Sequence, residues 1–320
     1  MSHFVINKHG HNIAHSQHIN LPQMKHESII IPSTSAPTWG GYFVIDFRER
    51  NCNLHDLILQ FNASALTGYT GTNSTSPRYN PAYFWFSRIE LVQNNNVIDT
   101  IYPNQQFLMN QLFNFDEQRT LINLNCGSYS DTTQRATLAA SANAYYVDLW
   151  TYFQQGHLPI LNQKDDLQIR IYMDTLANNA ITGTATLTTV PIGTINSCNL
   201  IARVTRLQSV DISNRLKSIN SRPEHYKFNE LRFGTFAVNS GVSSTSIVLT
   251  PLTGHCNFLF FTLRPTASIV GEGYYNYTAL TNFAILDGTS TNIVGGQAIP
   301  NAMALLYLGR LLGCPKALNQ

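Results

Sequence analysis

The sequence predicts an all-β fold made of two consecutive eight-stranded antiparallel units with short inserted helices. Two observations lead to this prediction. Apolar and polar residues alternate over many short segments, which is typical of strands with one buried face. An order of elements found in the first half of the chain also recurs in the second half, as expected of a repeated unit.

The composition favours a protein with large cores and a weakly charged surface. The 320 residues are enough for two compact domains, and 43% of them are hydrophobic. Only 12% are charged, about half the usual share for soluble domains. Such a surface suits a protein packed against copies of itself, although glycan-binding and secreted β-proteins have similar surfaces. The net charge of +2 disfavours an electrostatic nucleic-acid binder, so no specific nucleic-acid partner is expected.

Residues 1–26 are predicted to form an extended N-terminal arm. The alternative is a metal-binding tract, because the segment holds six of the ten histidines: His3, His9, His11, His15, His18 and His26. Their irregular spacing and the lack of a nearby Cys or carboxylate before Glu27 favour an arm that orders against a neighbouring surface. The segment lacks the apolar core of a signal peptide, and no run in the chain approaches the ~18 apolar residues of a membrane span.

The first predicted strands cover residues 29–31, 42–47 and 54–61, and a surface loop follows at 67–80. In the second strand Phe43, Ile45 and Phe47 share one face, and in the third Leu57 and Leu59 share one. Each pattern repeats every two residues, so each strand is expected to bury a single face.

Residues 84–102 predict a β-hairpin followed directly by a helix. The turn is formed by Asn94, Asn95 and Asn96, since Asn tolerates a positive φ more easily than most residues. Ile89 and Leu91 point to one side of the outgoing strand. The helix covers 103–115, where Pro103 stands at a tolerated first-turn position and apolar residues recur at helical spacing at Leu108, Leu112 and Phe115.

A polar excursion with some helix near 117–124 is predicted for residues 116–144, before the strands resume. Residues 145–153 alternate, with Tyr145, Val147, Leu149 and Phe153 on one face, and 156–163 form a connector. Residues 167–173 give the clearest alternation, with Leu167, Ile169, Ile171 and Met173 on one face. Another strand is predicted at 200–210, and the domain boundary lies near 211–220.

The second half repeats this order. Strands are predicted at 226–238, 245–249, 257–263, 283–286 and 292–294, and an amphipathic helix at 300–312. In each half a strand is followed by a loop, a strand–turn–strand and a helix that begins with proline. The predicted domains are therefore 27–210 and 211–320, and the second is short enough to be abbreviated or to need completion by another segment.

The sequence contains no phosphate-binding loop, HExxH, GxSxG or GxGxxG motif, and no catalytic, cofactor or metal site is predicted. The carboxylate pairs Asp116-Glu117 and Asp165-Asp166 are interpreted as solvated loop charges or charges at a helix N-terminus. Asp148 stands opposite the apolar face of its strand, where it could pair with an arginine across an interface or help to hold a cation.

The isolated histidines and aromatic residues allow a structural or a functional interpretation. His55, His157, His225 and His255 have no partner in the sequence. Stacking on sugars is conceivable for Trp85, Trp150 and Tyr152, but core positions are more common for aromatic residues of strands. The cysteines are odd in number and widely spaced, which favours buried free thiols in a reducing compartment over disulfides or zinc: Cys52, Cys126, Cys198, Cys256 and Cys314.

Several segments in this order resemble the double jelly-roll major capsid proteins of icosahedral DNA viruses, including membrane-containing phages. The first jelly roll is matched by FVIDFRERNCNLHDLILQF, by RIELVQNNNVIDTIY, and by the aromatic strand 145–153 with the Leu158-Pro159 connector and strand 167–173. The segments PEHYKFNELRFGTF and HCNFLFFTLRP are similar to the opening of the second jelly roll. The resemblance covers about residues 42 to 310.

The resemblance implies a non-enzymatic shell protein of the virion, assembled in the host cytoplasm. Three copies would form a capsomer of pseudo-hexameric outline, which contacts neighbouring capsomers, vertex (penton) proteins and minor capsid proteins. The loops 62–83 and 116–144 would form a tower or contacts between subunits, and the arm would meet the inner side of the shell or an internal membrane. The alternative is a jelly-roll carbohydrate-binding module or lectin that uses exposed aromatic residues in the loop 273–277.

Overall fold

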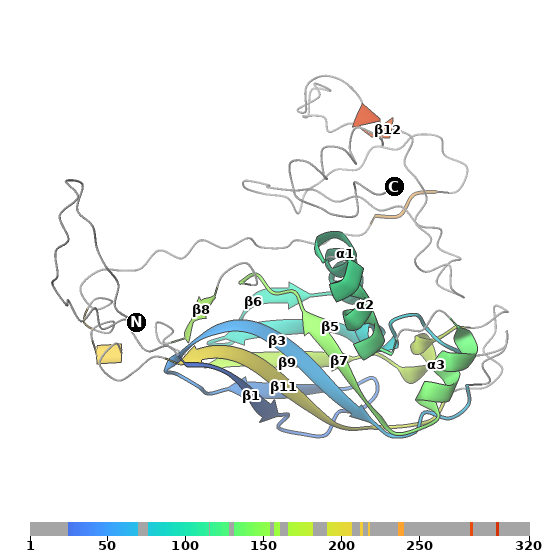
Figure 1. The fold of residues 1–320 in the computed structure, drawn as a ribbon, viewed down its shortest axis with the longest axis horizontal. Helices are drawn as coiled ribbons and strands as arrows, with labels where there is room; N and C mark the ends of the chain where they lie inside the picture. The colour runs from blue at the N-terminus through green and yellow to red at the C-terminus, as the bar shows by residue number, and fades with distance from the viewer. Residues whose placement is uncertain are drawn as a thin grey trace, which may run out of the picture.

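The computed structural model shows one antiparallel β-sandwich formed by residues 25–206 (Figure 1). Structure is described for residues 25–69, 76–114, 116–127, 131–153, 157–160, 166–181 and 191–206, and for the short pieces 212–213, 217, 236–239, 282–283 and 299–300. The predicted elements in 1–24 and most of those in 207–320 lie outside the described residues.

Eight long strands are divided between two sheets. Their bounds are β1 (Lys25–Pro32), β2 (Tyr42–Phe47), β3 (Cys52–Ala63), β5 (Phe86–Gln93), β6 (Asn96–Ile101), β7 (Asn143–Leu149), β9 (Leu167–Met173) and β11 (Ile195–Arg206). The first sheet has the order β1-β11-β3-β7, with the short β8 (Leu158–Pro159) also paired with β3. The second sheet has the order β2-β9-β5-β6. Two short strands of two residues each, β4 (Ser76–Pro77) and β10 (Ala180–Ile181), pair with each other.

The eight long strands pair in sequence order, from the first and last strands toward the middle two. The first long strand pairs with the last, β1 with β11; the second pairs with the second-last, β2 with β9; the third pairs with the third-last, β3 with β7; and β5 pairs with β6. All of these pairs are antiparallel. This is the arrangement of a jelly roll, in which one long series of hairpins is rolled into two facing sheets. The prediction of an eight-stranded antiparallel unit in the first half is confirmed.

The core lies between the two sheets and follows the alternation that the sequence predicts. Leu167, Ile169, Ile171 and Met173 of β9 are buried, and so are Phe43, Ile45 and Phe47 of β2. Strand β7 contributes Tyr145, Val147 and Leu149 from the opposite sheet. At about 25 cal/mol for each Å² of apolar surface removed from water, these alternating faces supply the main force that holds the sheets together.

The predicted turn joins β5 to β6, but it is formed by Asn94 and Asn95 alone, because Asn96 is the first residue of β6. Asn94 and Asn95 have φ angles of 48° and 60°, and Gln93 pairs with Asn96 across the turn. Two consecutive positive φ angles in a two-residue loop are the geometry that matches the twist of a hairpin. On the return strand Asp99 and Ile101 face inward while Ile98 is half-buried, because Asp99 lies opposite the buried Leu91.

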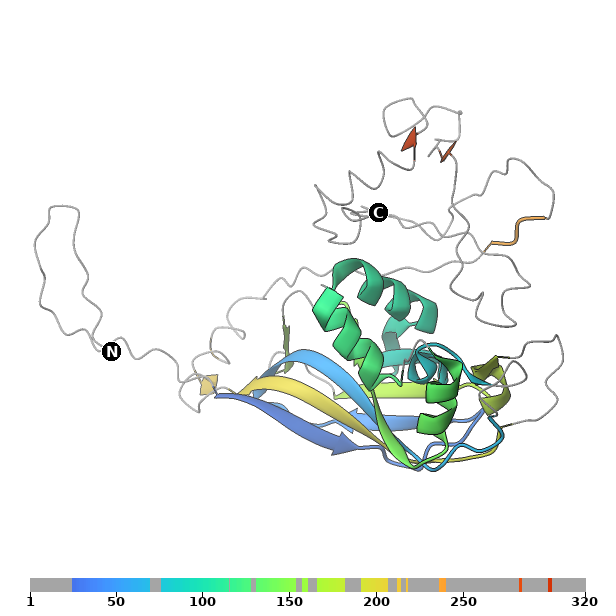
Figure 2. The same ribbon diagram turned by 45° about the vertical axis from the view of Figure 1, so that its right-hand side comes forward.

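Three α-helices lie between β6 and β7, and Figures 1 and 2 show α1 and α2 above the sandwich and α3 at one end of it. The helices are α1 (Pro103–Phe113), α2 (Asp116–Asn125) and α3 (Thr132–Ala139). The first two confirm the predicted helical segments, whereas α3 was not predicted. Leu108 is only half-buried, and among the side chains of α1 that the structure describes the buried apolar ones are Phe107 and Met109.

Helix α3 begins with an N-cap that provides a test of local stability. The Asp131 carboxylate accepts a hydrogen bond from the backbone N–H of Thr133 at 2.9 Å. Replacing Asp131 with alanine should lower the free energy of unfolding by about 1 kcal/mol, because it removes this acceptor. Asp131→Asn retains an acceptor and should cost at most a few tenths of a kcal/mol. Denaturant titrations followed by circular dichroism measure both values, and equal losses in the two variants would contradict the capping role.

The bounds of some predicted elements differ slightly from those observed. Strand β1 begins at Lys25, so Lys25 and His26, the last two residues of the predicted arm, pair with β11. Strand β11 covers Ile195–Arg206, earlier than the predicted 200–210. In the second half, β12 (Asn282–Phe283) pairs with β13 (Ile299–Pro300). The predicted helix therefore does not begin at Pro300, because this residue pairs with Asn282 in β13.

Candidate functional site

The described members of the two carboxylate pairs lie in an ion pair and at the start of a helix. Asp166 forms an ion pair with Arg50 at 2.7 Å, with both side chains about half exposed. Asp116 and Glu117 are the first two residues of α2, a position where negative charge interacts favourably with the helix dipole. Asp165 lies outside the described residues.

Three histidines far apart in the sequence meet at one end of the first sheet. Between β11 and β3 the register shifts so that Arg203 faces Asp56 and Val204 faces Leu54. The skipped residue, His55, is an extra residue in β3, and such a bulge turns its side chain to the same side as that of Asp56. His55 thereby comes close to His26 of β1 and to His157, which the sequence alone did not indicate.

The hydroxyl of Thr205 lies between two of these histidines, His26 and His55. Its Oγ1 is 2.7 Å from His55 Nε2 and 2.8 Å from His26 Nδ1, and only 2% of Thr205 is exposed. The ring centroids of His55 and His157 are 5.8 Å apart. Among the described residues no three His, Cys, Asp or Glu side chains are arranged to hold a metal ion. His225 and His255 lie outside these residues.

The cysteines that are described are free and buried, as predicted: Cys52, Cys126 and Cys198. Burial raises the pKa of the Cys52 thiol to about 11 and raises the pKa values of Cys126 and Cys198 further. A thiol must lose its proton to act as a nucleophile, so burial makes these three weak nucleophiles at neutral pH. Cys256 and Cys314 lie outside the described residues.

The aromatic residues considered for sugar stacking are buried or half-buried. Trp85 is 1% exposed. Trp150 and Tyr152 are half-buried, and their backbone is held by buried polar side chains. Gln106 of α1 donates to the carbonyl of Trp150 at 2.8 Å, and Asp99 of β6 accepts from the N–H of Tyr152 at 3.3 Å. These bonds attach α1 and β6 to the end of β7.

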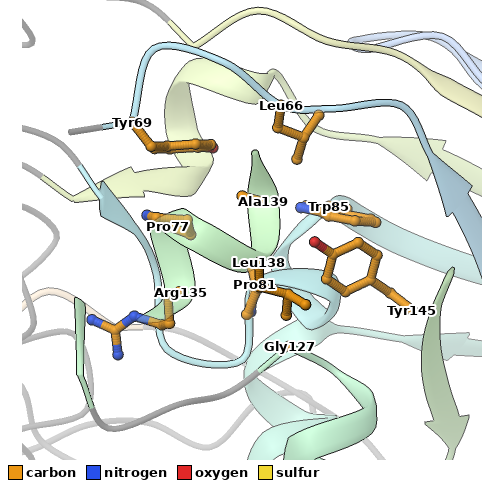
Figure 3. Close-up of a pocket in the computed structure, with 10 residues that line it drawn as sticks. All are labelled: Leu66, Tyr69, Pro77, Pro81, Trp85, Gly127, Arg135, Leu138, Ala139 and Tyr145. Atoms are coloured by element: carbon orange, nitrogen blue, oxygen red, sulfur yellow. The ribbon is translucent and has the colours of Figure 1, made fainter. Parts of the chain in front are cut away.

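One small cavity lies beside Trp85 and Tyr145 (Figure 3). It has room for about one water molecule, so it cannot bind a substrate of ordinary size. Arg135 contributes to the wall, and Figure 3 shows its guanidinium group extending away from Trp85 and Tyr145. Arg135 is 1% exposed, and its guanidinium carbon is 6.0 Å from the ring centroid of Tyr79.

The outer face of the second sheet is polar, and its side chains stack on, pair with and hydrogen-bond to one another. Tyr42 stacks on Tyr172 with ring centroids 5.6 Å apart, and the guanidinium carbon of Arg88 lies 3.7 Å from the centroid of the Tyr172 ring. Arg88 forms an ion pair with Glu90 at 2.8 Å, and Glu90 accepts a hydrogen bond from the Tyr172 hydroxyl at 3.0 Å. We call this surface the tyrosine face.

The outer face of the first sheet is aliphatic at its centre. The register places Ile30 of β1 beside Ile201 of β11, and Ile201 beside Ile58 of β3. Ile30 is 64% exposed, while Ile58 and Ile201 are half-buried. Asp148 of β7 continues this row, since it pairs with Ile58. We call the surface formed by Ile30, Ile58, Ile201 and Asp148 the isoleucine face.

Asp148 is the described carboxylate with the most perturbed acidity on this surface. Burial raises its pKa to about 6, the nearby charge of Asp56 adds to the rise, and Arg203 opposes it. Arg203 itself forms an ion pair with Asp56. The interpretation of Asp148 as a cation ligand gains no support among the described residues, where no suitable group of ligands is found.

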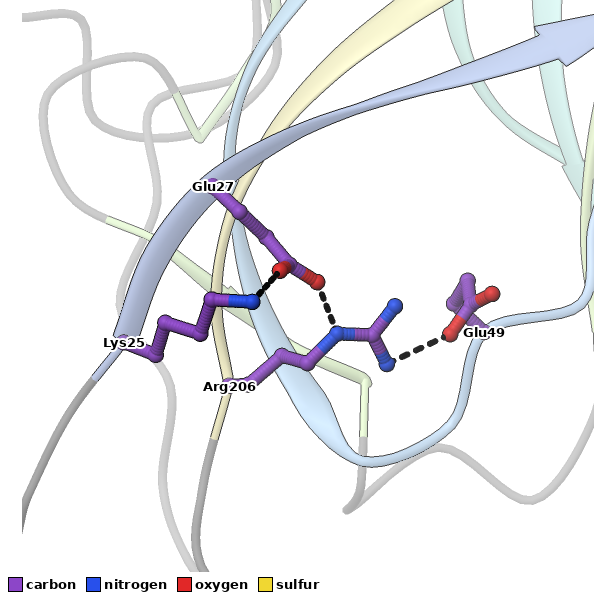
Figure 4. Close-up of polar contacts among 4 residues, drawn as sticks. All are labelled: Lys25, Glu27, Glu49 and Arg206. Atoms are coloured by element: carbon purple, nitrogen blue, oxygen red, sulfur yellow. Dashed lines mark hydrogen bonds and ion pairs between the residues drawn. The ribbon is translucent and has the colours of Figure 1, made fainter.

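An ionic cluster joins the start of β1 to the end of β11 (Figure 4). Lys25 pairs with Glu27 at 2.7 Å, Glu27 pairs with Arg206, and Arg206 pairs with Glu49 at 2.9 Å. Hydrogen bonds from Lys25 and then from Arg206 lower the pKa of Glu27. Since Lys25 and Arg206 are also register partners, residues 1–24 and 207–320 join the sandwich at the same corner.

Solved structures of viral capsid proteins match this chain, and this is the class of protein that the sequence resembles. In the PBCV-1 virus capsid the matching chain is 15% identical, with a TM-score of 0.46, and the match covers 60% of this chain and 45% of that one. The Faustovirus major capsid protein is 11% identical, with a TM-score of 0.49 and coverage of 65% and 58%. The mavirus major capsid protein is 12% identical, with a TM-score of 0.34 and coverage of 58% and 47%.

This chain therefore spans about half the length of the capsid proteins that it matches. No protein-family model and no curated protein matches the sequence. Within the described part of the chain, none of the helices has the length and apolar character needed to cross a membrane.

Proposed function

We propose that the chain is a major capsid protein of an icosahedral DNA virus, a structural protein of the virion without a catalytic role. The observation that carries this proposal is the jelly roll itself, with all eight strands paired from the ends inward and two broad outer faces. Its sheets offer wide surfaces for contact with copies of the chain. The low share of charged residues reduces the desolvation cost of burying these surfaces.

The proposed assembly follows from the resemblance in the sequence. Residues 211–320 form a second, shorter jelly roll beside the first, and three chains form a capsomer with a pseudo-hexameric outline. The capsomers meet one another and the vertex and minor proteins of a shell that assembles in the host cytoplasm. The N-terminal arm extends from the corner at Lys25 toward the inside of the shell, where it contacts the inner surface or a lipid layer.

The first test of this function is the mass of the full chain in solution. A capsomer predicts a stable particle of three times the 35.8 kDa chain mass, seen by light scattering and by mass photometry over a range of concentrations. Negative-stain images of the same sample should show a pseudo-hexagonal outline. Each measurement uses the unmodified protein, so no variant can fail to fold and obscure the result.

Two results would contradict the capsid proposal. One is a chain that stays monomeric at every concentration, because a shell protein must associate with itself. The other is a monomer that binds selectively to a glycan array, which would favour the lectin alternative. A trimer that does not bind glycans supports the capsid function and excludes the alternative.

A further inference from the structure

The two outer faces of the sandwich differ in their side chains: one is polar and internally hydrogen-bonded, and the other is aliphatic at its centre. On the tyrosine face, Tyr42, Tyr172, Arg88 and Glu90 stack and hydrogen-bond to each other. The outer side of a solvated strand normally carries polar residues. The isoleucine face departs from this rule, since three β-branched aliphatic residues lie side by side at its centre.

The residues that surround the isoleucine row are mostly uncharged and already paired. Asn199 donates to Gln60 at 3.0 Å, and Gln60 donates to the Tyr146 hydroxyl at 3.0 Å. In the row beyond Asn199 and Gln60, Asn62 donates to Ser197 at 2.8 Å. On the other side of the row, Arg203 pairs with Asp56. Such a surface can be covered by another apolar surface at a small desolvation cost, because few of its polar groups would lose a partner.

The covering segment is indicated by the place where the chain leaves the sandwich. Strand β11 is an inner strand of this same sheet, and it ends at Arg206. The 114 residues from 207 to 320 follow directly, which is enough for a compact domain. A segment tethered to the sheet that it covers has an effective concentration on the order of millimolar, which favours it over a free second copy.

The charges of the two parts are complementary. Residues 211–320 contain eight Lys or Arg and five Asp or Glu, a net charge of +3, whereas residues 1–210 carry a net charge of −1. On the isoleucine face and the adjoining row, the charged groups are Asp56, Asp148 and Arg203, a net charge of −1. A basic partner would therefore be attracted to the edge of the isoleucine row where Asp148 lies.

We propose that residues 211–320 of the same chain pack against the isoleucine face and bury Ile30, Ile58 and Ile201. The tyrosine face then remains available for contacts with other chains. This inference deepens the proposed function, on which it rests in taking residues 211–320 to be a folded unit, and it specifies which sheet of the first jelly roll faces the second.

Photo-crosslinking of the full chain tests this contact. A benzoylphenylalanine residue in place of Ile30 is suitable because the side chain is 64% exposed, so the substitution should not disturb the core. Tyr42 is a matched control, since it is 63% exposed and lies on an edge strand of the other sheet. After irradiation, denaturing gels separate crosslinks within a chain from those between chains, and mass spectrometry of digests identifies the partner peptides.

The expected result is a product of single-chain mass in which position 30 is joined to peptides of 211–320, while position 42 gives no such product. The same probe at Ser28, another exposed position on this side of β1, should give crosslinks to the same peptides. A product of double mass from position 30 would overturn the inference, because a second copy would then cover the face. Crosslinks only to residues 1–210, or none at all, would also overturn it.

These results can be separated from a failure of the capsid proposal. A monomer with the expected crosslink within one chain would retain the packing of 211–320 and contradict the capsid function. A trimer whose position 30 crosslinks between chains would retain the capsid function and contradict the packing within one chain.

Discussion

Replacing Trp85 with alanine should lower the free energy of unfolding by about 3–5 kcal/mol, the usual cost of removing a large aromatic side chain from a core. Trp85 is 1% exposed and follows η1 (Pro81–Phe84) at the start of β5. Its ring meets those of Trp39, Phe61 and Tyr145 edge-on, with centroid distances of 5.8, 5.7 and 4.6 Å. Phe61 and Tyr145 belong to the first sheet and Trp85 leads into the second, so Trp85 joins the two layers of the sandwich.

Urea titrations followed by circular dichroism measure this loss without depending on tryptophan fluorescence. The control is Tyr42→Ala, which removes an aromatic ring that is 63% exposed and should cost less than about 1 kcal/mol. Equal losses in the two variants would mean that Trp85 does not hold the sheets together. A loss confined to Trp85→Ala supports the packing of the two sheets around this ring.

The elements best predicted from the sequence are those whose pattern is local. Strand β9 was predicted with its observed bounds because it alternates strictly over seven residues. The Asn94-Asn95 turn was predicted because few residues tolerate two positive φ angles in succession. In both cases the information lies within the segment, and packing against the rest of the sandwich reinforces it.

Helix α3 was not predicted because its apolar residues are small and few. Its sequence TTQRATLA has a weak helical pattern, and a buried arginine, Arg135, takes the place of an apolar core residue. In α1 the buried positions include Gln106 and Asn110, so a search for apolar periodicity finds the helix but not the side that packs. Gln106 is buried because its amide bonds to the backbone of Trp150, a contact 44 positions away in the sequence.

The histidine cluster and the isoleucine face depend on strand order, which no local pattern contains. His26 and His55 meet because β1 and β3 both flank β11 and because one extra residue in β3 turns His55 to the outer face. His157 joins them because it precedes β8, which pairs with β3. Ile30 and Ile201 are 171 positions apart and become neighbours only when the first and last strands pair. The sequence identified Asp148 as exceptional on its strand, but the neighbours that alter its acidity come from β3 and β11.

Replacing Asp148 with asparagine should stabilise the protein at pH 8 by about 1–3 kcal/mol, because each unit of pKa shift corresponds to about 1.4 kcal/mol and the side chain is half-buried. Burial, together with the charge of Asp56, raises the pKa of Asp148 from its ordinary 3.8 to about 6. Between these two values the folded protein binds more protons than the unfolded chain. The stability of the native protein therefore falls as the pH rises from about 4 to about 6, and the loss is complete above that range.

The asparagine variant lacks this titration, so its advantage should be full at pH 8 and should fall to about half a kcal/mol near pH 4, where Asp148 is protonated in the folded protein and close to half-protonated in the unfolded chain. Urea titrations of both proteins at pH 4, 5, 6, 7 and 8 follow the difference. Asp166→Asn is the control, because Asp166 lies in an exposed ion pair with Arg50 and its loss should cost no more than about 1 kcal/mol. An advantage of Asp148→Asn that is equal at pH 4 and pH 8 would show that the burial of a charge is not its cause. An advantage that follows the pH would show that the native protein keeps a partly buried carboxylate on the isoleucine face at the expense of stability.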